Sequence, residues 1–266
     1  MKFIHITDLH LTTPGNLLWG LDPFARFDAC LADIATHHGD ASFCAITGDL
    51  TECGEAGVYE ALKQRLVNFP IITHLMLGNH DDRENYLAVF GGADATGHVQ
   101  HVMERGGQFF LFLDTLKGPP FSAGRYDAPR REWLKSELKK TNGAPCYIFM
   151  HHPPFAIGHP LMDLIGLEEP EAFYELLQGH GVRHIFFGHA HRTISGQWRG
   201  IAFSALPSLN HQLPLIGGSV ETVYSDEPPM YAVVLIKDDR TIVHADAFLN
   251  RAPAQMAMGA ERGNWF

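Results

Sequence analysis

The chain has 266 residues, of which 45% are hydrophobic, and its formal net charge is −10. This length is sufficient for one large domain or two small ones with a substantial core. The acidic balance argues against nucleic acid as the main partner, because a phosphate backbone needs a basic surface. A small phosphorylated substrate stays compatible, since bound metal ions can supply local positive charge.

Strands and helices alternate along the first two hundred residues. Asp22-Pro23 can begin a helix that buries one apolar stripe and ends near Gly39. Further helices are expected over residues 55–66, 83–90 and 170–177, and another begins at residues 127–129. Short apolar runs broken by Gly or Asp predict buried strands, and they cover residues 3–6, 43–46, 71–77, 108–114, 147–150 and 184–187.

After Gly200 the pattern changes to strands, over residues 201–206, 231–236 and 241–248. Residues 207–230 between them are rich in Pro, Gly and Ser, and a loop of this length is usually functional or an interface. We therefore expect one domain over residues 1–250, with 207–230 as a cap or interface loop of a homo-oligomer, and a loosely held tail over 251–266.

Cysteine usage and hydropathy indicate where the protein resides. The four cysteines include no C-x-x-C pair, so free thiols are expected: Cys30, Cys44, Cys53 and Cys146. No apolar run reaches the roughly 18 residues that a membrane span requires, and Met1 leads directly into a strand. We expect a cytoplasmic protein without a signal peptide or a membrane partner.

Side chains that can bind metals occur in five short blocks, and most of these blocks directly follow an apolar run. The blocks are Asp8-Leu9-His10, Gly48-Asp49, Gly78-Asn79-His80-Asp81, His151-His152 and Gly188-His189-Ala190-His191. Ligands of an open α/β sheet lie beyond the carboxyl ends of its strands, so the blocks should meet at one edge of one sheet. Asp8 and His10 point to the same side if the strand pattern persists past its end, and His189 and His191 repeat that spacing.

The residue types predict the chemistry of this edge. Carboxylates, imidazoles and an amide without thiolates suit Mn, Fe, Co or Zn. The blocks hold too many ligands for one ion but suit two ions that share a carboxylate. Paired ions clamp the attacking and leaving oxygens of a displacement at phosphorus, and they make hydroxide available as the nucleophile by lowering the pKa of a bound water.

The order D-x-H, G-D, G-N-H-D, H, G-H-x-H resembles the calcineurin-like binuclear metallophosphoesterases over roughly residues 1–210. The segments His151-His152-Pro153-Pro154, Met162-Asp163 and His211-Gln212 look like the bacterial branch of class III cyclic nucleotide phosphodiesterases and glycerophosphodiesterases. The resemblance implies a four-layer α/β/β/α sandwich with a small cap or dimerisation loop.

The resemblance also implies roles for particular residues. One ion would be held by Asp8, His10, Asp49 and His191, and the other by Asp49, Asn79, His151 and His189, so that Asp49 bridges them. His80 is similar to the family's histidine that contacts the phosphoryl group and protonates the leaving group. Asn79, His80 and His211 are the expected substrate contacts.

Two positions depart from the family pattern. Glu52 stands where this branch often has Asn, and its carboxylate could hold His80 as an imidazolium. Cys53 matches a cysteine that some relatives pair with one near the C-terminus, but this chain has no cysteine after Cys146, so that disulfide is not expected.

Several other residues near the blocks admit two interpretations. His5 lies within a strand and is expected to be a hydrogen-bonded core residue, while His152 should face away from its ligand neighbour. Trp19 and Phe155 could form a wall or stack on a base. Met162 and Asp163 are open candidates for substrate contact.

Three functions are compatible with these residues. The first is a metal-dependent phosphodiesterase acting on glycerophosphodiesters or cyclic nucleotides. The second is a phosphomonoesterase or nucleotide pyrophosphatase with the same two ions. The third is a scaffold without turnover, which the retention of every expected ligand and of His80 argues against.

Overall fold

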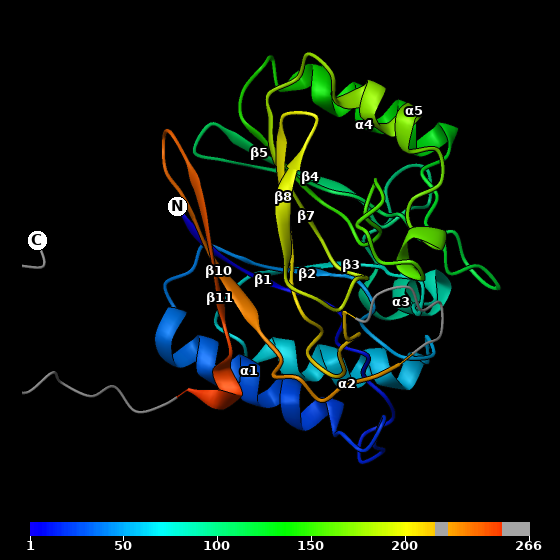
Figure 1. Cartoon of the computed structure of the whole chain (residues 1–266), viewed down its shortest axis with the longest axis vertical. Helices are drawn as coiled ribbons and strands as arrows, with labels where there is room; N and C mark the ends of the chain where they lie inside the picture. The colour runs from blue at the N-terminus through cyan, green and yellow to red at the C-terminus, as the bar shows by residue number, and fades with distance from the viewer. Residues whose placement is uncertain (216–222, 252–266) are drawn as a thin grey trace, which may run out of the picture.

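A computed structural model describes residues 1–215 and 223–251 of the chain, and these residues form two sheets and their flanking helices (Figure 1). The first sheet has the strand order β11-β10-β1-β2-β3. Its strands are β1 (Lys2–Ile6), β2 (Cys44–Thr47), β3 (Thr73–Met76), β10 (Tyr231–Ile236) and β11 (Thr241–Asp246). The second sheet has the order β4-β5-β6-β7-β9-β8. Its strands are β4 (His101–Arg105), β5 (Gln108–Phe112), β6 (Cys146–Phe149), β7 (Val182–Phe187), β8 (Ile194–Trp198) and β9 (Ile201–Ala205).

Helices cover the outer faces of both sheets. The bounds are α1 (Pro23–His38), α2 (Ala56–Val67), α3 (Arg83–Phe90), α4 (Ala128–Lys140) and α5 (Pro170–Leu177), with 3-10 turns η1 (Met162–Leu164) and η2 (Phe248–Asn250). Helices α1 and α2 lie below the first sheet in Figure 1, and α4 and α5 lie above the second. The predicted α/β/β/α sandwich is therefore confirmed.

The prediction of a single sheet is wrong. The parallel pairs β1–β2 and β2–β3 belong to the first sheet, whereas the parallel pairs β5–β6, β6–β7 and β7–β9 belong to the second. Strand β3 is an edge strand, and the chain then crosses to the other sheet. Apolar runs of equal length do not reveal this crossing, because a buried strand has the same composition in either sheet.

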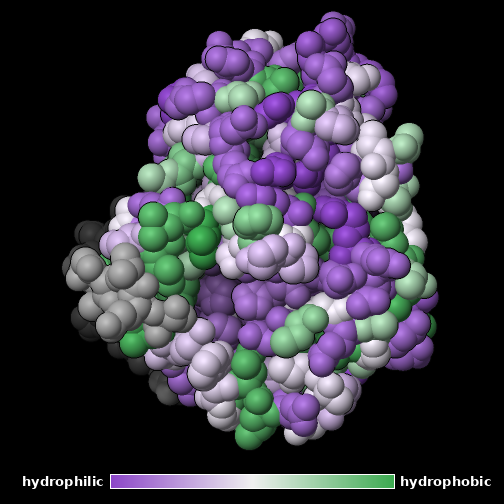
Figure 2. All heavy atoms as spheres, turned by 90° about the vertical axis from the view of Figure 1, so that its right-hand side faces the viewer, coloured by the Kyte–Doolittle hydropathy of each residue, from purple (hydrophilic) through white to green (hydrophobic). Residues whose placement is uncertain are grey.

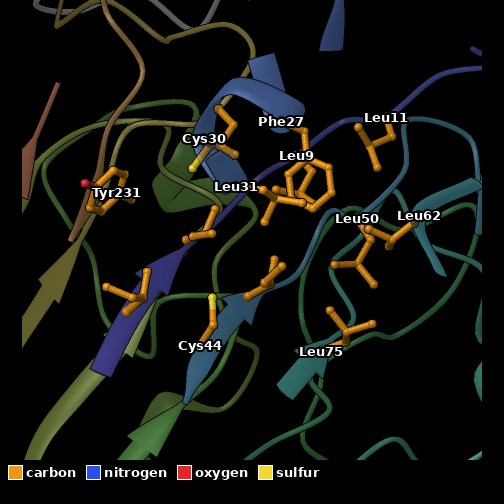
Figure 3. Packing of buried hydrophobic residues seen from close by; sticks show 14 of the residues in the cluster. Leu9, Leu11, Phe27, Cys30, Leu31, Cys44, Leu50, Leu62, Leu75 and Tyr231 are labelled. Carbon is orange, nitrogen blue, oxygen red and sulfur yellow. The ribbon is translucent and has the colours of Figure 1, made fainter. Parts of the chain in front are cut away.

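Helix α1 forms as its sequence predicts. The Asp22 side chain caps it by accepting a hydrogen bond from Ala25 N at 3.0 Å, and Pro23 occupies the first turn. Its apolar stripe packs on the first sheet and on the loops that follow the strands of that sheet. Figure 3 shows the side chains of Phe27, Cys30 and Leu31 near those of Leu9 and Cys44. The loops after β1 and β2 are therefore anchored by the same core as the helix.

Aromatic rings fill the space between the sheets. Phe3 of β1 stacks on Phe43, the residue before β2, with ring centroids 4.6 Å apart, and it meets Phe186 of the second sheet edge-on at 5.4 Å. Phe149 stacks on Phe186 at 4.9 Å. All four rings are fully buried, and each contributes roughly 1.5–3 kcal/mol by burial. This layer sets how the two sheets face each other.

Three histidines share this aromatic layer. His5 is fully buried with Nε2 2.8 Å from Thr47 Oγ1, which confirms it as a hydrogen-bonded core residue. His184 Nε2 lies 2.9 Å from Ser204 Oγ, and the His74 ring stacks on Phe112 at 4.4 Å. Burial lowers the pKa of His5 to about 3 and the pKa values of His74 and His184 to about 4.

Some boundaries differ from the sequence prediction. Strand β11 ends at Asp246, and Phe248 instead packs on Tyr231 from η2. Strands β4 and β8 were not predicted, because they are edge strands with no fully buried side chain and so lack an apolar run. All four cysteines are free, as predicted.

The ends of the predicted domain are only partly described. Residues 216–222 of the loop 207–230 and residues 252–266 of the tail lie outside the described residues, so the cap, the interface and the homo-oligomer stay predictions. Among the helices of the described ranges, none is long and apolar enough to cross a bilayer.

We expect the free energy of unfolding to fall as the pH drops below about 6.5. A histidine with a lowered folded pKa takes up a proton when unfolded but not when folded, so stability is lost between its unfolded and folded pKa values. Near pH 5, each such histidine should make the unfolding free energy fall by about 1.4 kcal/mol for each unit by which the pH is lowered. Urea unfolding of the chelated protein at pH 5 and pH 6 should therefore show a smaller pH slope for His184→Phe than for the wild type.

The control for this measurement is His244→Gln, which changes an exposed histidine on β11. The pH slope of His184→Phe should be smaller than the slope of this control. An unchanged slope in His184→Phe would mean that this histidine is protonated in the folded protein.

Candidate metal centre

The predicted ligands converge from both sheets. Asp8, Asp49 and Asn79 follow β1, β2 and β3 of the first sheet, and His151 and His189 follow β6 and β7 of the second. The two groups meet where the carboxyl ends of these strands approach each other, on the right of Figure 1. All of the predicted ligands are brought together, but across two sheets and not along one edge.

The first set of side chains is Asp8, His10, Asp49 and His191. All four are buried, and one ligand atom from each lies within 4.8 Å of the others. His10 Nε2 is 3.0 Å from His191 Nε2 and 3.6 Å from Asp49 Oδ2, while His191 Nε2 is 3.4 Å from Asp8 Oδ1. This is the group that the family resemblance implies for one ion.

The second set is arranged around His151. Its Nε2 lies 3.3 Å from Asp49 Oδ2, 3.2 Å from Asn79 Oδ1 and 3.2 Å from His189 Nδ1. Asp49 therefore contacts a member of each set, in the position of a shared carboxylate. His189 Nε2 is buried and has no hydrogen-bond partner among the described residues, so its Nδ1 is the atom that faces the centre.

The backbone at these residues does not continue the strand conformation. Asp8, His10, Asp49, His189 and His191 all have left-handed backbones, with φ between 46° and 67°. The expectation that Asp8 and His10 share a side because the strand persists is thus wrong, although both side chains do reach the centre. Each such residue costs on the order of 1–3 kcal/mol unless the surroundings hold it, and such strain concentrates at functional sites.

Hydrogen bonds fix the carboxylates before any ion arrives. Asp8 accepts from His189 N at 3.0 Å and from Thr7 Oγ1 at 2.6 Å. Asp49 Oδ1 accepts from His80 N at 2.9 Å. Burial raises the pKa of Asp49, but the neighbouring imidazoles of His151 and His80 outweigh burial and hold that pKa well below its usual range. The bridging position is thus occupied by a carboxylate.

Asp81 braces the loops on either side of this carboxylate, a role that the sequence did not reveal. It accepts from Leu50 N at 3.0 Å and Thr51 N at 3.1 Å after β2, and from Gly78 N at 2.9 Å after β3. The Tyr59 hydroxyl donates a further hydrogen bond at 2.8 Å. The only sequence signal was its place at the end of the G-N-H-D block.

The imidazole hydrogen bonds indicate that the centre is built for cations. His151 Nδ1 lies 2.8 Å from Thr47 O and His191 Nδ1 lies 2.9 Å from His211 O. Because a carbonyl can only accept, these Nδ1 atoms carry hydrogen, and the Nε2 of a neutral ring is then a lone pair. In neutral rings these lone pairs face other acceptors at 3.0–3.4 Å. Burial lowers the pKa of His151, but the charge of Asp49 outweighs burial and raises that pKa to about 9, so the cluster is stabilised by positive charge, either a proton on His151 or a bound metal ion. The residues therefore fit divalent metal ions, with each ring oriented by its second nitrogen.

Glu52 binds a different histidine from the one predicted. Its Oε2 lies 2.7 Å from His10 Nδ1 but 3.6 Å from His80 Nδ1, and His80 instead approaches the Glu52 backbone carbonyl at 3.0 Å. Burial lowers the pKa of His80, but the charges of Asp49 and then Glu52 outweigh burial and raise it above its ordinary value. Asp49 therefore contributes more than Glu52 to the raised pKa of His80, and a role of Glu52 in tuning His80 stays a prediction.

A cavity of about 290 Å³ opens onto both sets of side chains. The surface that carries it faces the viewer in Figure 2, where hydrophilic atoms lie in a hollow near the middle. The predicted substrate contacts Asn79, His80 and His211 all border it. The remaining lining includes residues that no motif indicated, namely Ser122, Leu161, Ile165, Leu213 and Tyr224.

The open candidates are now placed. Met162 borders the cavity, whereas the Asp163 carboxylate accepts from Ile157 N at 2.7 Å in a neighbouring turn. Phe155 packs in the core of the second sheet, with its ring 4.6 Å from Phe203. His152 is buried, and its nitrogens lie within 3.1 Å of Thr115 Oγ1 and Ser122 O. One of its ring nitrogens nevertheless lies within 4.8 Å of a ring nitrogen of His151 and of His189, so the expectation that it faces away from the centre is wrong.

Comparisons with known proteins show which family the chain resembles. The model of the calcineurin-like phosphoesterase family matches residues 1–193. A probable cyclic nucleotide phosphodiesterase of Rhodopseudomonas palustris is 37% identical over 259 residues, which are 95% of this chain and 94% of that protein. A glycerophosphodiester phosphodiesterase of Enterobacter lignolyticus is 27% identical over 245 residues, 86% of this chain and 84% of that protein.

A solved structure shows the same fold. A dimetal phosphatase from Danio rerio superposes with a TM-score of 0.69 at 14% sequence identity, covering 92% of this chain and 95% of that one. The chain belongs to the calcineurin-like phosphoesterases. Its resemblance to the bacterial class III branch is confirmed by relatives named as cyclic nucleotide and glycerophosphodiester phosphodiesterases.

We expect Gly78→Ala to be destabilising, because its added Cβ would lie 2.2 Å from Asp49 Oδ1 and 2.5 Å from Asp49 N. The loss should be roughly 1–3 kcal/mol of unfolding free energy, as for other overpacked sites. Gly57→Ala is the matched control, since its Cβ would meet no atom within 4 Å. Urea unfolding of the two variants without metal would measure the difference in unfolding free energy. Equal free energies would show that the loop around Asp49 moves at no cost to admit the added methyl group.

Proposed function

We propose that the protein is a metal-dependent hydrolase of small phosphodiesters, either cyclic nucleotides or glycerophosphodiesters. The observation that carries the proposal is the pair of ligand sets that share Asp49 beneath one cavity. The names of its relatives support a diester as the substrate.

Two divalent transition ions, of Mn, Fe, Co or Zn, suit this set of nitrogen and oxygen donors. Asp8, His10, Asp49 and His191 would hold one ion, and Asp49, Asn79, His151 and His189 would hold the other. When bound, such a pair neutralises charge on the phosphoryl group and lowers the pKa of a water. The chain contributes rigid positions for these ligands, since the Asp8 and Asp49 carboxylates are already oriented by backbone N–H groups.

His80 is the proposed general acid. Its ring borders the cavity, and it does not belong to either ligand set. Its Nδ1 is committed to the Glu52 carbonyl at 3.0 Å, so Nε2 is the atom available for a substrate. From there it can give a proton to the oxygen of the departing alcohol while its backbone N–H keeps Asp49 in place.

The proposal predicts that diesters are better substrates than monoesters. A diester carries a second organic group that can contact the apolar lining from Leu161, Met162 and Ile165, and it brings one negative charge fewer towards Glu52. Purified protein reconstituted with Mn²⁺ should bind two equivalents of metal. Its kcat/KM should be higher for bis(p-nitrophenyl) phosphate than for p-nitrophenyl phosphate, and chelation should abolish both activities. A higher value for the monoester would contradict the proposal.

His80→Ala should lower kcat by roughly 10²–10⁴-fold while both metal equivalents are retained. The loss should be much smaller when the leaving group is p-nitrophenolate, because that oxygen departs without a proton. The comparison uses cyclic AMP or glycerophosphocholine against the p-nitrophenyl diester, with metal content measured on the same samples. Equal losses for both kinds of leaving group would make His80 an electrostatic contact and not an acid.

A further inference from the structure

An aromatic pair stands at the rim of the proposed active site. Trp19, from the loop before α1, stacks on Tyr224, with ring centroids 4.1 Å apart and planes 23° apart. Tyr224 borders the cavity and meets the His211 ring edge-on at 4.8 Å. The His211 ring in turn lies 4.9 Å from that of His10. The rings thus lead from a proposed metal ligand outwards to the surface.

Core packing does not account for this pair. Trp19 is 56% exposed and Tyr224 is 37% exposed, although both are large hydrophobic side chains. Trp19 also holds a left-handed backbone with φ of 54°, within a tight turn closed by hydrogen bonds between Leu18 and Leu21. An exposed aromatic in a strained turn gains little from burial, and such features concentrate at binding sites.

The two segments that carry the pair are tied to α1. Arg26 donates to Asn210 O at 2.6 Å and pairs with Asp226, two residues beyond Tyr224. Three residues after Asn210, the Leu213 carbonyl accepts a hydrogen bond from Arg192 at 2.7 Å. These contacts hold the chain near Tyr224, while the hydrogen bonds between Leu18 and Leu21 hold the turn that carries Trp19.

The rest of the cavity lining offers apolar surface beside the aromatic pair. Away from the two ligand sets it includes Leu161, Met162, Ile165 and Leu213, together with the polar side chains of His80, Ser122 and His211. The Glu52 carboxylate also lines the cavity, but it is already hydrogen-bonded to His10. Recognition of a glycerol group needs unoccupied donors and acceptors, whereas a planar ring needs apolar and aromatic surface.

We propose that Trp19 and Tyr224 form the wall against which the organic group of the ester binds, and that this group is a planar aromatic ring, as in a nucleotide. The proposal rests on the phosphodiesterase function proposed above and selects nucleotide diesters over glycerol diesters. A base can stack on such a ring whatever its hydrogen-bonding edge, so the wall selects the class of substrate and not the particular base.

The test compares two substrates on Mn²⁺-loaded full-length protein, cyclic AMP and glycerophosphocholine. Tyr224→Ala and Trp19→Ala should each lower kcat/KM for cyclic AMP by roughly 5–100-fold, mainly through KM, as expected for the loss of stacking on one base. Tyr224→Phe should keep the activity because it keeps the ring. Leu17→Ala is the matched control, since Leu17 is exposed on the same loop.

A binding measurement tests the wall without turnover. Calorimetric titration of the metal-loaded protein with AMP and with glycerol 3-phosphate should show tighter binding of AMP, and Tyr224→Ala should weaken AMP alone. Equal losses for both ligands or both substrates would overturn the proposal, because the pair would then only support the site. Preference of the wild type for glycerophosphocholine would also overturn it. If no diester is hydrolysed, the proposed function fails, and the AMP titration still decides whether the wall binds a base.

Discussion

The metal centre depends on how two separate sheets pack against each other. Asp49 comes from the first sheet and His151 from the second, and their side chains must meet within about 3.3 Å. Nothing in either sheet alone sets that distance. The aromatic layer sets it, because the stacked and edge-on rings of Phe3, Phe149 and Phe186 leave little freedom for one sheet to slide over the other.

The loops beyond the strands then determine where each ligand points. Left-handed residues turn the chain sharply at Asp8, Asp49 and His189, and this conformation is unfavourable for side chains with a Cβ. Hydrogen bonds hold these turns, from His189 N to Asp8 between the two sheets and from Gly188 N to the His151 carbonyl at the end of the second sheet. Glycine neighbours make the turns compact, since Gly48 and Gly78 approach His151 too closely for any side chain. Packing energy elsewhere in the fold thus maintains a strained but rigid site.

Glu52 illustrates how one residue can act on both parts of the site. Its carboxylate orients His10, a proposed ligand, and its carbonyl orients His80, the proposed acid. The proposed ligand His10 and the proposed acid His80 are therefore fixed relative to one another through a single loop that follows β2. The same loop is braced by Asp81, which accepts from Leu50 N and Thr51 N of that loop and from Gly78 N of the segment that carries Asn79 and His80. Displacing this loop would affect the ligands and the acid together.

The sequence by itself indicated the side chains that the structure brings together at the centre, and most of the helices and strands that carry them. The motif spacing and the family resemblance pointed to all of the proposed ligands, whereas the bracing role of Asp81 and lining residues such as Tyr224 gave no signal in the sequence. The helix from Pro23 was predictable because its cap and apolar stripe are local. The tertiary structure alone decided that the ligands are divided between two sheets, that Glu52 pairs with His10, and that Trp19 stacks on Tyr224. These contacts join residues far apart in the chain, and their geometry depends on sheet packing and loop conformation, which leave no periodic trace in the sequence.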